Sequence, residues 1–174
     1  MVFGVIHSHK GIIDVESKLG KGTTFWLYLP ASQVVEPVSV KDEETLEEIP
    51  GGTETLLVVE DEEMLMMSLR IVLVEKGYKV LSAEDGMTAL KIYQERKNDI
   101  ALVLTDLGLP NINGLEVCQR IKKINPKERI IVATGFLDPE MRSEFLEAGI
   151  QNFLFKPYDL KQVLKVVREV LEEK

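Results

Sequence analysis

The stretch IALVLTD, residues 100–106, is a nearly unbroken apolar run that closes on a threonine and an aspartate. Runs of the same kind lie on both sides of it, and the complete set covers residues 55–59, 79–83, 100–105, 129–134 and 152–156. Apolar residues at helical spacing follow each run. Strands therefore alternate with helices throughout residues 55–174.

This alternation predicts a parallel sheet with helices on both faces, a doubly wound α/β fold. Right-handed crossovers restrict the topology to a few strand orders, and we expect the order 2-1-3-4-5. Local signals agree with the helix positions. Asp85 is a candidate N-cap, Asp138 is followed by Pro139 at the first helical position, and Gly77 and Gly149 end helical patterns.

Binding sites in such sheets lie beyond the carboxyl ends of the strands, so the residues that follow each strand are the candidates. Glu60 and Asp61 follow the first predicted strand, and Asp106 follows the third, which should be its neighbour. Three clustered carboxylates repel one another unless a cation lies among them. Mg²⁺ suits oxygen ligands and few protein contacts, so we expect a Mg²⁺ site here.

Two further side chains at strand ends complement this negative charge. Thr134 ends the fourth predicted strand and Lys156 ends the fifth. A carboxylate can attack phosphorus and form an acyl phosphate, and a cation and a hydroxyl would stabilise the transferring group. Each residue alone has an ordinary explanation, such as a solvated loop acid or a β-forming threonine. The combination at one edge of one sheet favours phosphoryl transfer.

The segments VVEDEE (58–63), LTDLGLPNINGLE (104–116), VATG (132–135) and FLFKPYDL (153–160) resemble the receiver domain of bacterial two-component response regulators. The resemblance extends over residues 55–174 and implies a flavodoxin-like (βα)5 fold. It implies that Asp106 is the phosphoacceptor. It also implies that Glu60, Asp61 and Asp106 bind Mg²⁺ together with the backbone carbonyl of Gly108.

The same resemblance assigns roles to residues of the last two strands. Thr134 is similar to the switch hydroxyl, Lys156 to the phosphate-binding lysine and Phe153 to the switch aromatic residue. The Lys156–Pro157 bond is cis in the family, which the sequence permits. Phosphorylation would then alter a protein-binding face made by the fourth helix, the fifth strand and the fifth helix. A receiver dimer through that face is possible.

The resemblance implies a signalling module and not an enzyme, with a sensor histidine kinase or a histidine phosphotransfer protein as its partner. A second hypothesis is a flavin- or nucleotide-binding protein of the same fold. Flavodoxin-like folds bind phosphate through a loop rich in serine, threonine and glycine after the first strand. Here that loop is Glu60–Glu63, which repels phosphate without a cation.

Residues 1–31 predict a β-hairpin, with strands at Gly11–Glu16 and Thr23–Leu29. The stretch VFGVIHSHKGIIDVESKLGKGTTFWLYLP resembles the end of a histidine-kinase ATP-binding domain, although it is too short to be an active kinase. His7 and His9 do not match the phosphorylated histidine of a kinase. An isolated hairpin is marginally stable, so we expect another element to cover its apolar side.

Residues 32–54 predict a solvated linker, since residues 36–48 contain six acids and a single lysine. The order of kinase remnant, acidic linker and receiver resembles the end of a hybrid histidine kinase. The formal net charge of −8 argues against direct binding to nucleic acid. No apolar run reaches the roughly 18 residues of a membrane span, so we expect a cytoplasmic protein. A single cysteine, Cys118, excludes an internal disulfide.

Overall fold

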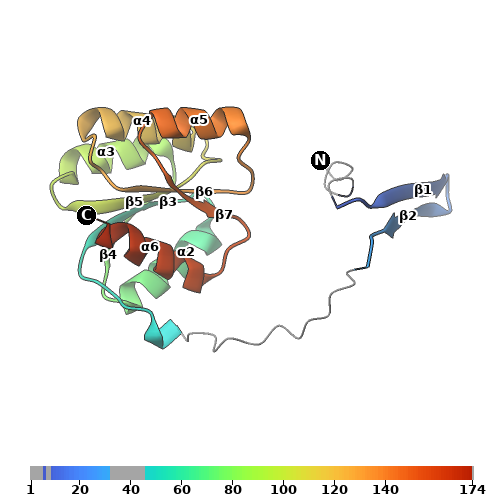
Figure 1. Cartoon of the computed structure of the whole chain (residues 1–174), viewed down its shortest axis with the longest axis horizontal. Helices are drawn as coiled ribbons and strands as arrows, with labels where there is room; N and C mark the ends of the chain where they lie inside the picture. Colours follow the sequence, from blue (N-terminus) through green and yellow to red (C-terminus); the bar gives the residue numbers. More distant parts are fainter. Residues whose placement is uncertain (1–5, 7–8, 32–45, 174) are drawn as a thin grey trace. The chain divides into compact units, whose positions relative to one another are not determined.

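The structure is a computed structural model that describes residue 6 and residues 9–31 and 46–173. These residues fall into two compact units, one within residues 1–43 and the other within residues 44–174. The first unit contains a two-stranded antiparallel sheet and the second a five-stranded sheet (Figure 1). His7 and residues 32–45 of the predicted linker lie outside the described residues.

The larger unit alternates strands and helices in the predicted rhythm. Its strands are β3 (Thr55–Val59), β4 (Lys79–Ala83), β5 (Ile100–Asp106), β6 (Ile130–Thr134) and β7 (Asn152–Phe155). Its helices are α2 (Glu63–Glu75), α3 (Gly86–Arg96), α4 (Gly114–Ile124), α5 (Pro139–Glu147) and α6 (Leu160–Glu172). All four strand pairings are parallel, and the order is β4-β3-β5-β6-β7. This confirms the doubly wound sheet of order 2-1-3-4-5.

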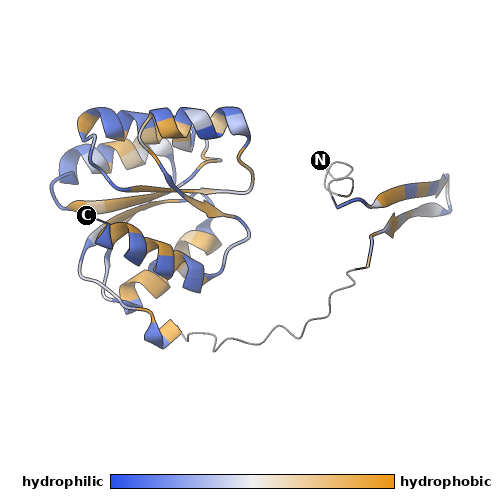
Figure 2. Ribbon diagram, viewed as in Figure 1, coloured by the Kyte–Doolittle hydropathy of each residue, from blue (hydrophilic) through white to orange (hydrophobic). Residues whose placement is uncertain are grey.

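Helices cover both faces of the sheet. Helices α3, α4 and α5 lie on one face, and α2 and α6 lie on the other (Figure 1). Each layer encloses its own cluster of buried apolar side chains. The strands are correspondingly hydrophobic, while polar residues gather on the outer sides of the helices (Figure 2). Burial on both faces explains why the strands appear in the sequence as continuous apolar runs.

The predicted helix starts are confirmed by their caps. The carboxylate of Asp85 accepts a hydrogen bond from the Thr88 amide at 2.9 Å, and that of Asp138 accepts one from the Met141 amide at 2.8 Å. These caps satisfy amides that have no partner within their own helix. They fix where α3 and α5 begin, directly after the loops at the carboxyl edge of the sheet.

The segment before β3 packs more closely than the sequence indicates. Residues 46–54 were assigned to the linker, but a short 3-10 helix, Leu46–Glu48, leads into Ile49, which is only 2% exposed and belongs to the core shared with α2 and α6. The Lys76 ammonium donates to the carbonyl of Ile49 at 2.6 Å. The boundary of the packed unit therefore lies before residue 55. A single isoleucine among acidic residues has no periodicity from which its burial could be predicted.

The smaller unit is the predicted hairpin, with β1 (Ile12–Lys18) paired to β2 (Gly22–Tyr28). Gly20 and Gly22 adopt positive φ values of 76° and 96°, which allows the tight turn. Val15 lies opposite Phe25 on one face, and Phe25 is 61% exposed. Within the described residues, the apolar face of the hairpin is therefore open to solvent.

Candidate functional site

Three carboxylates meet at the carboxyl edge of the five-stranded sheet. Asp106 is the last residue of β5, while Glu60 and Asp61 directly follow β3. Because β3 and β5 are adjacent in the sheet, their ends lie side by side. One oxygen from each of the three carboxylates lies within 4.8 Å of the others. The structure thus brings together the three acids that the sequence predicts to cluster.

Lys156 reaches this cluster from the far edge of the sheet, just after β7. Its ammonium nitrogen lies 3.0 Å from Oδ2 of Asp106 and 3.3 Å from Oε2 of Glu60. Its backbone amide donates to the carbonyl of Thr134 at 2.8 Å, and the Lys156–Pro157 bond is cis. Burial alone would lower the pKa of Lys156, but its bond to Asp106 and the nearby carboxylates outweigh burial and raise it. The lysine is therefore charged.

The cluster favours an added cation. Glu60 is only 3% exposed, and burial raises the pKa of its carboxyl group, reinforced by Asp106 and opposed by Lys156. Three carboxylates face a single ammonium, so negative charge is in excess. Carboxylate oxygens within a few ångströms of one another, with Asp61 exposed to water, suit a hard divalent ion that keeps part of its hydration shell. The residues present fit Mg²⁺.

Thr134, at the end of β6, is 3% exposed and lies beside this cluster in the sheet. Its hydroxyl donates to the carbonyl of Phe136 at 2.6 Å, and it accepts from the Phe136 amide at 3.2 Å. The hydroxyl is therefore held by its own loop. The Phe136 side chain is 74% exposed. Thr134 must release that carbonyl before its hydroxyl can bond to a group on Asp106.

Phe153 lies on β7, opposite Val132 of β6. Its ring is partly buried and packs edge-on against Phe145 of α5, with centroids 5.5 Å apart and an interplanar angle of 79°. Two residues further along the strand, Phe155 is 57% exposed. Phe153, the predicted switch residue, thus contacts α5 within the core between the sheet and helices α3, α4 and α5.

Two features near the cluster were not predicted from the sequence. Tyr158 follows the cis proline, and its hydroxyl is buried without a hydrogen-bond partner among the described residues. The outer side of α2 carries a stripe of exposed apolar residues, which are 48–71% exposed: Met64, Met67, Ile71 and Val74. This α2 stripe could have been predicted from the sequence, because its residues recur at helical spacing on a different face of α2 from the buried residues.

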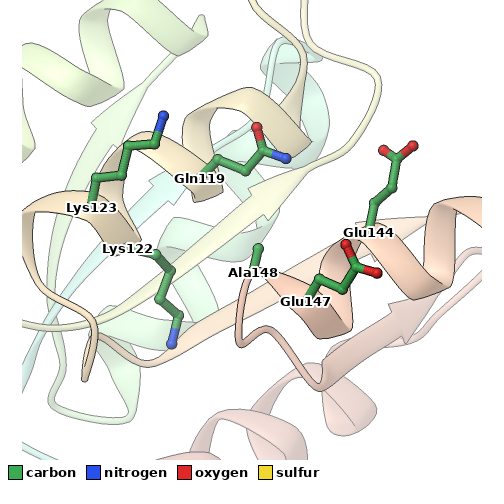
Figure 3. Close-up of a pocket in the computed structure, with 6 residues that line it drawn as sticks. All are labelled: Gln119, Lys122, Lys123, Glu144, Glu147 and Ala148. Atoms are coloured by element: carbon green, nitrogen blue, oxygen red, sulfur yellow. The ribbon is translucent and has the colours of Figure 1, made fainter.

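A groove of about 480 Å³ lies elsewhere, between α4 and α5 (Figure 3). It is lined by Gln119, Lys122, Lys123, Glu144, Glu147 and Ala148. None of these residues belongs to the carboxylate cluster. This groove is therefore separate from the site at the strand ends.

The family model for the response regulator receiver domain matches residues 56–168. The chain belongs to the response regulator receiver family. Its receiver domain is 30% identical to the chemotaxis protein CheY of Bacillus subtilis over 117 residues, covering 67% of this chain and 96% of CheY. Such receivers act in two-component phosphorelay signalling, and the likeness does not favour the flavin- or nucleotide-binding hypothesis.

Solved structures confirm the fold. The non-phosphorylated HemR receiver domain of Leptospira biflexa is 30% identical, with a TM-score of 0.65, and the match covers 70% of this chain and 96% of that one. The sensor kinase CckA of Brucella abortus is 31% identical over 181 residues, covering 99% of this chain. The chain spans only 19% of the length of CckA. No helix in the described part of the chain is long and apolar enough to cross a membrane.

Proposed function

We propose that the receiver domain accepts a phosphoryl group from a phosphohistidine onto Asp106 in a Mg²⁺-dependent reaction. The observation that carries this proposal is the position of the Lys156 ammonium, 3.0 Å from Asp106 and 3.3 Å from Glu60 within a cluster of three carboxylates. Two of the carboxylates thereby share one cation at the carboxyl end of the sheet. The cluster as a whole keeps an excess of negative charge that favours a metal ion.

In this reaction a carboxylate oxygen of Asp106 attacks the phosphorus atom of the donor. The new P–O bond forms as the P–N bond to the imidazole breaks, and the bonding electron pair leaves with the imidazole nitrogen. Lys156 is placed to bind an oxygen of the transferred group. The Thr134 hydroxyl can bind another after it leaves the Phe136 carbonyl. A Mg²⁺ ion held by Glu60, Asp61, Asp106 and the carbonyl of Gly108 would neutralise the transferring charge.

We propose that phosphorylation is read out at the face formed by α5, β7 and α6. The phosphoryl group carries a charge of about −1.5 to −2 beside Thr134. Movement of Thr134 toward that charge would change the space available to Phe153 on the adjacent strand, and so its packing against Phe145. The exposed Phe155 lies on the same strand. A partner protein or a second receiver would bind this face.

The phosphodonor, a sensor histidine kinase or a histidine phosphotransfer protein, must bring its histidine to Asp106. We propose that its helices dock on the α2 stripe, because α2 begins at Glu63, immediately after the acidic loop. The stripe residues are spaced so that they share one helix face. Met67→Lys with Ile71→Lys should slow transfer from such a donor and leave labelling by acetyl phosphate unchanged. Met87→Lys, at an exposed methionine of α3, is the matched control.

We further propose that residues 1–31 correspond to the end of a histidine-kinase ATP-binding domain, in the tail of a hybrid sensor kinase. The likeness to CckA supports this, since it extends over 99% of the chain. The exposed apolar face of the hairpin suits burial against a larger sheet. A hairpin alone cannot form the several walls of a nucleotide pocket, so this chain would act as a phosphoacceptor and not as a kinase. The need for an ATP-derived donor favours a cytoplasmic location.

The central proposal is tested with acetyl phosphate as a small phosphodonor and intact mass spectrometry as the readout. We expect the wild type to gain one phosphoryl group with Mg²⁺ and none with EDTA. Asp106→Asn should gain none. Asp99→Asn, at an exposed aspartate paired with Arg96, should behave as the wild type. Full labelling of Asp106→Asn would refute the assignment of the phosphoacceptor.

A further inference from the structure

Tyr158 lies just after the lysine that contacts the acid cluster. It follows Lys156 by two residues, and the intervening Pro157 is in the cis form. The aromatic ring packs against the core cluster between α2 and α6. Its hydroxyl oxygen is buried, yet it has no hydrogen-bond partner among the described residues. Since buried hydroxyl groups are nearly always paired in folded proteins, this one calls for a partner other than the described residues as they now lie.

The electrostatic surroundings identify the kind of partner. Burial raises the pKa of Tyr158 to about 12; the charge of Lys156 opposes this rise, and those of Glu60, Asp106 and Glu62 reinforce it. The phenol is therefore neutral and can donate its proton in a hydrogen bond. The acceptors whose charges reach it are two carboxylates of the acid cluster, Glu60 and Asp106, and that of the neighbouring Glu62. Glu60 is the most buried of them, at 3% exposed.

The present partner of Glu60 is one that phosphorylation would remove. Oε2 of Glu60 is held by the Lys156 ammonium at 3.3 Å, while Oε1 accepts a long bond from the Glu62 amide at 3.3 Å. When Lys156 turns to an oxygen of a phosphoryl group on Asp106, Oε2 loses this donor. A carboxylate has lone pairs for several partners, so a metal ion on Glu60 would leave room for a replacement donor, and that donor would stabilise the loaded state.

We propose that Tyr158 is a positioning residue of the phosphoryl site, whose hydroxyl donates to the Glu60 carboxylate, directly or through one water, when Lys156 engages the phosphoryl group. The inference rests on the proposed function. It explains why a hydroxyl lies at a buried position where no described residue bonds to it. The Tyr158 hydroxyl would then form this hydrogen bond to Glu60 in the loaded state alone.

Tyr158→Phe tests this inference because it removes only the hydroxyl. Tyr78→Phe is the matched control, since the Tyr78 hydroxyl is likewise buried but lies at the amino end of β4, beside Gly52 and Arg168. The probe is Mg²⁺ with beryllofluoride, a phosphoryl analogue, followed by calorimetry. Thermal unfolding is measured on each protein with and without the probe.

We expect Tyr158→Phe to bind the probe roughly three- to tenfold more weakly than the wild type, the usual effect of one lost hydrogen bond. Its unfolding temperature without the probe should be unchanged or higher. Tyr78→Phe should bind as the wild type does. Equal binding by Tyr158→Phe overturns the inference, and so does a lower unfolding temperature without the probe, because the hydroxyl would then already have a partner. Failure of the wild type to bind would instead overturn the proposed function.

Discussion

The contact between residues 46–50 and the receiver domain predicts that stability depends sharply on where the chain is shortened. Removal of residues 1–43 should leave the stability of the receiver unchanged, because these residues belong to a separate compact unit. Removal of residues 1–50 also deletes Ile49, which is 2% exposed, and the carbonyl that Lys76 binds at 2.6 Å. The longer deletion should therefore destabilise the domain.

The size of the effect follows from the buried side chain. Ile49→Ala removes about three carbon groups from the core, which at about 0.8 kcal/mol each gives roughly 2.4 kcal/mol. The cavity left behind increases this value, so we expect about 3 kcal/mol. For a domain of this size, that corresponds to a decrease of roughly 10 °C in the unfolding temperature.

The measurement is urea and thermal unfolding by circular dichroism, with the protein lacking residues 1–43 as the reference so that the hairpin does not contribute. Ile49→Ala is made in that background and compared with Leu46→Ala, a 38% exposed residue of the same segment. The Leu46 variant should differ from the reference by less than about 0.5 kcal/mol. Equal stability of the Ile49 variant and the reference would refute the packing argument.

Three further predictions concern the acid cluster. Burial raises the pKa of Glu60 above the ordinary value of 4.5, so protons should compete with Mg²⁺ at a higher pH than they would at an exposed glutamate. Calorimetry should show that the affinity for Mg²⁺ falls as the pH is lowered. Glu60→Gln should bind Mg²⁺ weakly and with less dependence on pH. Because the pKa of Glu60 is raised in the folded state, the metal-free domain should lose stability as the pH rises from 4.5 through that raised pKa. Urea unfolding at several pH values should show this loss in the wild type and not in Glu60→Gln. The double variant Gly108→Asn, Phe136→Glu should lose the phosphoryl group faster than the wild type. A Cβ at residue 108 would lie 3.6 Å from Oδ2 of Asp106, where an amide can orient the attacking water. First-order decay equal to or slower than that of the wild type would contradict this.

Much of the receiver fold could be predicted because its signals are local. Strands buried on both faces are continuous apolar runs, and the caps at Asp85 and Asp138 mark helix starts within four residues of sequence. The meeting of Glu60, Asp61 and Asp106 follows from one more rule, since handed crossovers place β3 beside β5. These features depend on neighbours in the chain or in the strand order.

The alternating elements, the expected strand order and the acids at the carboxyl edge could thus be predicted from the chain alone. Which side chains share a partner could not. The burial of Ile49, the Lys156 bridge to Glu60 and Asp106, and the engagement of Thr134 with Phe136 each depend on side-chain directions across separate elements. The unpaired hydroxyl of Tyr158 is of the same kind. No periodicity encodes such contacts, because hydrogen bonding and close packing act on distances in space and not on spacing along the chain.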